Sequence, residues 1–177
     1  MSKLNVDQGN RDLEAGKGPP DWVAEHLRVY RESGGAEGHL FDATIAGVPG
    51  LVPCLLLTTI GRRSGEKRTS PLFYGTAGDA YVIIGSKGGA DTQPGWYLNL
   101  LANPTAEVQV AREHFTVRAR VAAGREREQL WEQMARMAPP YRDYQKKTKR
   151  EIPVVVLEKQ PRHLTRARRE PLSVFCP

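Results

Sequence analysis

The feature that most constrains the fold is a series of short apolar segments separated by tight turns. Residues 51–59 (LVPCLLLTT) are almost continuously apolar, and their length and flanking glycines favour a buried strand over a helix. Residues 68–74 and 81–85 predict two more strands, joined by the tight-turn sequence Ala77-Gly78-Asp79. This part of the chain is therefore expected to form antiparallel sheet.

Three further strands are predicted closer to the C-terminus, over residues 107–111, 115–121 and 154–157. Residues 115–121 alternate apolar and polar side chains, so one face of this strand is expected in the core and the other in water. Six short strands with short connections indicate a small, mostly antiparallel barrel, because closure removes the exposed edges that an open sheet would leave.

Helices are predicted around these strands from apolar residues at helical spacing. In the first helix the apolar stripe consists of Trp22, Val23, Leu27 and Tyr30. The predicted helices run from the Pro-Pro pair at 19–20 to the break at 33–35, over 96–101, from Gly124 to the Pro-Pro pair at 139–140, and over 141–149.

Length and composition indicate one domain of residues 19–160 between two terminal segments. Residues 1–18 are polar without periodicity and are predicted to be a disordered arm, and residues 161–177 form a basic tail. Cys54 and Cys176 suggest neither a disulfide framework nor a zinc site, and the four histidines lack ligand spacing, so no metal is expected. With no signal peptide or membrane-spanning run, the predicted location is cytoplasmic.

The strongest sign of a binding site is a basic loop at residues 61–70, with the sequence GRRSGEKRTS. Arg62, Arg63 and Arg68 offer guanidinium groups that can grip phosphate or carboxylate in two-pronged fashion, and Ser64 adds a hydroxyl. The chain has a formal net charge of +6, so its surface attracts anions in general. The alternative interpretation is a hairpin tip that charge keeps in water.

A second loop, Ser86-Lys87-Gly88-Gly89, follows an apolar strand and precedes the helix at 96–101. It offers a hydroxyl, an ammonium group and unhindered backbone amides at a strand-to-helix transition. We expect both loops at the same rim of the barrel. The alternative is an ordinary flexible turn.

Other catalytic motifs are excluded. The chain contains neither the glycine pattern of a Rossmann dinucleotide site nor a P-loop. Residues 64–67 match the S-x-x-K pattern of serine acyl enzymes, but the companion motifs of those enzymes are absent.

The motifs GRRSG, SKGG and WYLNLLANP occur in this order within residues 55–110, and PPYRDYQKKTKREIPVVVLE follows at 139–158. This combination resembles the deazaflavin-dependent nitroreductase family, whose members bind the 8-hydroxy-5-deazaflavin coenzyme F-420. The resemblance implies a split β-barrel like those of flavin reductases and pyridoxamine oxidases, mainly β with flanking helices. It also implies an oxidoreductase that transfers a hydride from the reduced coenzyme to an electron-poor acceptor.

The resemblance further implies how the coenzyme is held. Its phosphate and oligoglutamate tail would lie along the first basic loop, and its ring edge and phosphate against the second. Tyr141 and Tyr144, with Ser86, are the candidate catalytic residues, although tyrosines at this spacing also suit the edge of a core. The implied coenzyme-binding residues are Arg62, Arg63, Ser64, Arg68, Ser86, Lys87, Gly88, Gly89, Trp96, Tyr97 and Asn99.

Two departures from the family pattern concern the acceptor. Nitroreductases of this family typically have a third tyrosine where this chain has Ala138. The aromatic residue that is expected to line the pocket is Phe73 here. We therefore expect a quinone, an activated enone or a nitro compound as the small-molecule acceptor.

Several alternatives stay open from the sequence. The barrel could be an enzyme that uses flavin mononucleotide (FMN), or a non-enzymatic module that binds a cofactor or another anion. Nucleic acid is not an expected partner, because the basic tail contains only one aromatic residue, Phe175. The first helix suggests weak contact with the inner face of the plasma membrane, with core packing as the alternative use. The sequence leaves a homodimer undecided.

Overall fold

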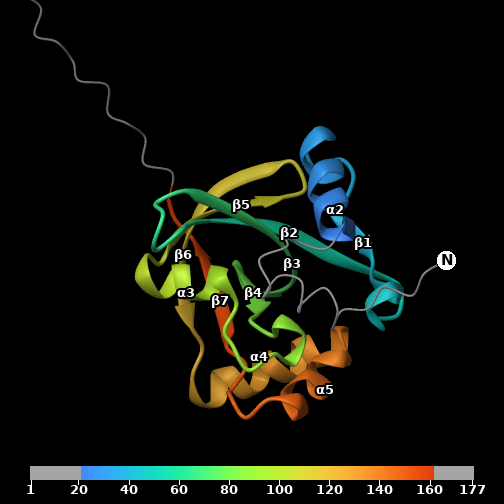
Figure 1. Ribbon diagram of the computed structural model, residues 1–177, viewed down its shortest axis with the longest axis vertical. Coiled ribbons are helices and arrows are strands. Elements are labelled where there is room, and N and C mark those ends of the chain that lie inside the picture. The colour runs from blue at the N-terminus through green and yellow to red at the C-terminus, as the bar shows by residue number, and fades with distance from the viewer. Residues whose placement is uncertain (1–20, 162–177) are drawn as a thin grey trace, which may run out of the picture.

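A closed six-stranded antiparallel barrel is the centre of the computed structural model, which describes residues 21–161 (Figure 1). Around the barrel the strand order is β2-β3-β4-β7-β6-β5, and β5 pairs back onto β2. The predicted barrel of six antiparallel strands is thus confirmed. Its strands are β2 (Leu51–Ile60), β3 (Lys67–Ala77), β4 (Ala80–Ile84), β5 (Thr105–Val110), β6 (Glu113–Val121) and β7 (Val154–Lys159).

A seventh strand, β1 (Leu40–Asp42), was not expected from the sequence. It pairs with the first residues of β2, where Leu40 lies opposite Pro53 and Asp42 opposite Leu51. The β2 residues from Cys54 onward pair with β3 and β5 instead. Three residues are too few for an alternating pattern, so only the long partner strand reveals β1.

The barrel interior is filled by one of the two hydrophobic clusters. Leu55 and Leu57 of β2 point into it and have no exposed surface, together with Ile83 of β4 and Leu157 of β7. The other face of β2 is buried as well, which explains why its sequence is continuously apolar rather than alternating.

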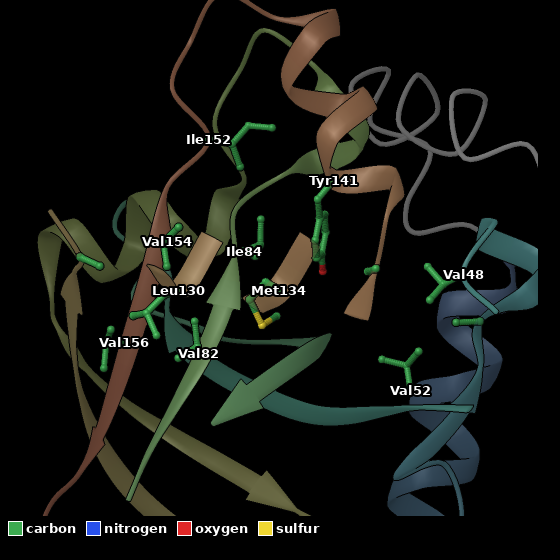
Figure 2. Close-up of a cluster of buried hydrophobic side chains, with 13 residues drawn as sticks. Val48, Val52, Val82, Ile84, Leu130, Met134, Tyr141, Ile152, Val154 and Val156 are labelled. Carbon is green, nitrogen blue, oxygen red and sulfur yellow. The ribbon is translucent and has the colours of Figure 1, made fainter. Parts of the chain in front are cut away.

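The second cluster lies on the outer face of β4 and β7, where α4 (Gly124–Met137) and α5 (Pro140–Lys147) cover it (Figures 1 and 2). Val82 and Val156 of the sheet pack here beside Met134 of α4, which is 1% exposed. Figure 2 shows Tyr141 extending from α5 into this cluster toward Met134. Removing a buried side chain of this size typically costs about 2–5 kcal/mol.

Helix α2 (Asp21–Glu32) packs beside β1 at another end of the barrel (Figure 1). The Tyr30 hydroxyl donates to the Cys54 carbonyl at 3.0 Å and accepts from the Ala111 N–H at 2.9 Å. His26, which was not in the predicted stripe, is also buried and bonds to the Gly38 carbonyl at 2.8 Å. None of the helices within residues 21–161 is long and apolar enough to cross a membrane.

The predicted arm at 1–18 and the predicted basic tail, apart from its first residue, lie outside the described residues.

Candidate active site

Both predicted loops leave the same end of the barrel. Strands β2 and β4 run in the same direction, because each is antiparallel to β3. The loop after β2 and the SKGG loop after β4, residues 86–89, therefore start at equivalent strand ends, as expected. Helix α3 (Gly95–Ala102) follows the SKGG loop and reaches the first loop through Asn99.

The SKGG loop has an unusual backbone. Ser86 is right-handed helical (φ −70°, ψ −42°), whereas Lys87, Gly88 and Gly89 have φ values of +46°, +64° and +86°. A reversal from right- to left-handed backbone brings successive N–H groups toward one concave surface of the kind that binds anions. Lysine rarely adopts a positive φ, so the surrounding contacts hold this conformation.

Helix α5 lies directly against this loop. A Cβ atom on Gly89 would lie 2.7 Å from the Tyr144 carbonyl oxygen and 3.0 Å from the Lys147 Cβ. Only glycine permits so close an approach, and φ +86° also favours glycine. The contact brings Ser86, Lys87, Gly88 and Gly89 to the helix that carries both candidate tyrosines, as the site prediction requires.

Arg150 also binds the loop, and it was not among the predicted site residues. Its guanidinium donates to the carbonyls of Ser86 and Ala90 at 2.7 Å each and to the Gly85 carbonyl at 3.2 Å. A fourth bond goes to the Gln93 side-chain oxygen at 2.9 Å. Burial lowers the pKa of Arg150, and the nearby Asp91 opposes this shift.

The two candidate tyrosines differ in exposure. Tyr141 is 7% exposed, and burial, followed by the neighbouring Tyr144, raises the pKa of its phenol well above the ordinary value. The phenol is therefore protonated near neutral pH and is able to donate a hydrogen bond. Tyr144 is half-buried, its ring lies edge-on to Tyr141 at 6.3 Å between centroids, and the Lys147 ammonium lies 5.6 Å from it.

Three polar groups of this site have no hydrogen-bond partner within the described part of the chain. They are the Tyr141 hydroxyl, the Ser86 hydroxyl and the Gly88 N–H. Lys87 is engaged, because its ammonium donates to the Thr92 hydroxyl at 2.7 Å. Each of these groups is therefore available to solvent or to a bound molecule.

The first basic loop is held by Asn99. The Asn99 side-chain oxygen accepts from the Arg62 backbone N–H at 3.1 Å, and its NH₂ donates to the Thr59 hydroxyl at 3.1 Å. The Arg62 guanidinium also approaches that oxygen, at 3.4 Å. Asn99 is 6% exposed and bonded on both ends of its amide to protein partners, so in this structure it fixes the loop to α3.

The cations of this loop differ in their partners. Arg68 pairs with Glu66 at 2.6 Å, and Lys67 pairs with Glu107 at 2.8 Å. Arg63 is exposed and forms no ion pair with a described residue. Ser64 accepts from the Glu66 N–H at 3.3 Å and so shapes the turn.

The aromatic residues of α3 face different ways. Trp96 is buried at the end of the barrel interior, beside Leu100. Tyr97 lines a shallow hollow of about 200 Å³ between α3 and strands β6 and β7, and burial, followed by Glu151, raises the pKa of its phenol. A second hollow of about 180 Å³ lies beside Arg31 on the outer face of β2 and β5. Neither hollow is lined by residues of the SKGG loop or α5.

A closed antiparallel barrel whose SKGG loop lies against a tyrosine-bearing helix is the arrangement expected of a cofactor-binding oxidoreductase of the split-barrel class. The model of the F420H(2)-dependent quinone reductase family matches residues 22–159. The chain belongs to this family. The resemblance drawn from the GRRSG and SKGG motifs is therefore confirmed, with quinones rather than nitro compounds in the family name.

Similar proteins support the same assignment. The F420H(2)-dependent quinone reductase Rv1261c of Mycobacterium tuberculosis is 40% identical over 138 residues, which are 76% of this chain and 88% of the relative. A solved F420-H2 dependent reductase, FDR-A, is 42% identical with a TM-score of 0.56, over 60% of this chain and 94% of that one. A solved domain-swapped dimer is 38% identical with a TM-score of 0.59, over 78% and 98%.

Family membership decides between two of the alternatives. The protein is an oxidoreductase, and its cofactor is coenzyme F-420. This excludes the FMN-dependent enzyme and the non-enzymatic binding module. The roles of the individual site residues stay predictions.

Proposed function

We propose that this protein transfers a hydride from reduced coenzyme F-420 to a quinone at the site between the SKGG loop and α5. The observation that carries the proposal is the contact of Gly89 with the Tyr144 main chain, where a Cβ would lie 2.7 Å from the carbonyl oxygen. It joins the loop that offers N–H groups to the helix that offers a protonated phenol.

The residues present fit the coenzyme. Ser86 and Gly88 offer donors that no described residue uses, on a backbone whose φ reversal suits an anion. Arg62 and Arg63 stand at the same end of the barrel for a tail with several negative charges. Exposed ion pairs contribute only about 0–1 kcal/mol each, so a cluster is needed to hold such a tail.

The chemistry divides between the coenzyme and the chain. Bound reduced F-420 supplies the hydride from the central carbon of its ring. The chain orients the two reactants and stabilises the charge that develops on the acceptor. A quinone that gains a hydride becomes a hydroquinone anion and then needs one proton. Tyr141 is the candidate donor of that proton, and its hydroxyl would regain one from solvent.

We prefer the quinone over a nitro compound or an activated enone on the names of the family and its relatives, beside one difference in the chain. Ala138, where a third tyrosine was expected, is 1% exposed and packs in the cluster beneath α5. It offers no hydroxyl, so Tyr141 and Tyr144 are the tyrosines that α5 presents. The relative Rv1261c and the family model are both named for quinone reduction, which favours the quinone as the acceptor.

The test compares cofactors and acceptors on the purified protein. We expect F-420 to bind more tightly than FMN in a fluorescence titration, and menadione to be reduced by F-420H₂ faster than a nitroimidazole. Equal or tighter FMN binding would refute the cofactor assignment. Faster reduction of the nitroimidazole would refute the acceptor.

The same assay tests the role of Tyr141. Tyr141→Phe should lower kcat with menadione by about 10²-fold, the scale of a lost general acid. Tyr81→Phe is the matched control, because Tyr81 lies beside Phe115 and Lys159, away from the SKGG loop. Equal kcat values for both variants would remove Tyr141 from the mechanism.

We also infer a homodimer that works in the cytoplasm, in contact with the inner face of the plasma membrane. The solved domain-swapped relative supports pairing. The exposed Leu40 (55%) and Leu51 (63%) of the β1–β2 pair support contact with lipid, where a membrane quinone would be found. Sedimentation as a monomer would exclude the homodimer. The absence of flotation with anionic vesicles would exclude the membrane contact.

A further inference from the structure

We infer that Arg150 is a positioning residue for the coenzyme, because it aims the N–H groups of the SKGG loop. This inference rests on the proposed location of the coenzyme. Arg150 binds carbonyls of the loop rather than its N–H groups, so it acts through the backbone that it holds.

Two of the three carbonyls that Arg150 binds, those of Gly85 and Ser86, belong to successive peptides of the loop. In a planar trans peptide the C=O and the following N–H point in opposite directions. The Gly85 carbonyl shares its peptide with the Ser86 N–H, and the Ser86 carbonyl shares its peptide with the Lys87 N–H. Since one guanidinium holds both carbonyls, at 3.2 and 2.7 Å, both N–H groups are directed away from it.

The same guanidinium also binds the chain on the C-terminal side of the loop. Its bonds to the Ala90 carbonyl at 2.7 Å and to Gln93 at 2.9 Å fix the chain beyond the glycines. The four bonds thus clamp the loop on both sides of Lys87, whose φ of +46° is not one that lysine adopts readily. Arginine suits this task because its planar fork presents five donors in fixed directions.

The main chain of Arg150 is itself bound to α5. The Gln145 side chain donates to the Arg150 carbonyl at 2.8 Å and accepts from the Ile152 N–H at 2.9 Å. The Thr148 hydroxyl donates to Asp91 at 2.8 Å, which ties the segment after α5 to the end of the loop. The SKGG loop is therefore oriented relative to the helix that carries Tyr141, with Arg150 as the shared support.

The test uses one substitution at two arginines. Arg150→Lys keeps a positive charge but cannot hold four separated acceptors. Arg127→Lys is the matched control. Arg127 donates to the Ile152 carbonyl at 3.1 Å and pairs with Glu151 on the same segment, but it has no bond to residues 85–93. The measurements are the Kd of F-420, the KM values of F-420H₂ and menadione, and the thermal midpoint.

We expect Arg150→Lys to raise the Kd and the KM for the coenzyme about tenfold or more while the KM for menadione stays within twofold. Arg127→Lys should leave both coenzyme constants within twofold, even if its thermal midpoint falls as far. Unchanged coenzyme constants in Arg150→Lys, or equal losses in both variants, would overturn the inference. If the wild-type protein does not bind F-420, the proposed function fails instead.

Discussion

The contact between Gly89 and α5 allows a quantitative prediction. Gly89→Ala introduces a methyl group at φ +86° that would lie 2.7 Å from the Tyr144 carbonyl oxygen. Left-handed backbone costs a non-glycine residue about 1–2 kcal/mol. Overpacking against a fixed backbone adds about 1–3 kcal/mol. The free energy of unfolding should therefore fall by about 2–5 kcal/mol, unless the loop moves away from α5.

Gly78→Ala separates the two contributions. Gly78 has φ +59° in the β3–β4 turn, and a Cβ there meets nothing within 4 Å. We expect urea unfolding to show a loss of about 1–2 kcal/mol for this variant, from the backbone alone. F-420 affinity should be unchanged in Gly78→Ala and about tenfold weaker in Gly89→Ala, since one lost hydrogen bond to a charged group is worth about 1.5–3 kcal/mol. Equal unfolding losses together with equal affinities would refute the reasoning.

Two further predictions concern charge and pH. Arg63→Ala should weaken F-420 binding more than Arg68→Ala, because Arg68 already pairs with Glu66; titrations at low salt should show differences of about 2- to 5-fold. Burial raises the pKa of Tyr30 to about 12, so the folded protein keeps this phenol protonated after the unfolded chain ionises it. Stability should be unaffected by this group below about pH 10 and fall as the pH rises further, and Tyr30→Phe should flatten that slope.

The regular elements were predictable from the sequence because each one repeats a pattern. The alternation of residues 115–121 gave β6, and its Val117 is fully buried as expected. Val121 is an exception at 43% exposed, where the strand reaches the rim of a hollow. The three residues of β1 carry no pattern of their own and form a strand only because the start of β2 extends beyond the barrel.

The site was predictable in its motifs but not in its supports. The SKGG loop and the tyrosines of α5 were identified from the sequence, and the structure brings them together. Arg150 and Gln145 lie within the 139–158 motif, but their supporting role could not be predicted, because a polar residue that binds backbone carbonyls has no spacing that reveals its partners. Asn99 was expected beside the coenzyme, yet its amide is spent on Arg62 and Thr59. Such bonds depend on segments that are far apart in the sequence.

The two hydrophobic clusters lie on opposite sides of the same strands. Alternate residues of β4 serve different clusters, with Ile83 inside the barrel and Ile84 beneath α5. Substitutions in the lumen therefore change the packing of the barrel on the face of β4 opposite to the one that packs beneath Tyr141. Substitutions meant to raise the stability of the protein are therefore better placed around Leu55 and Leu57 than among the neighbours of Tyr141.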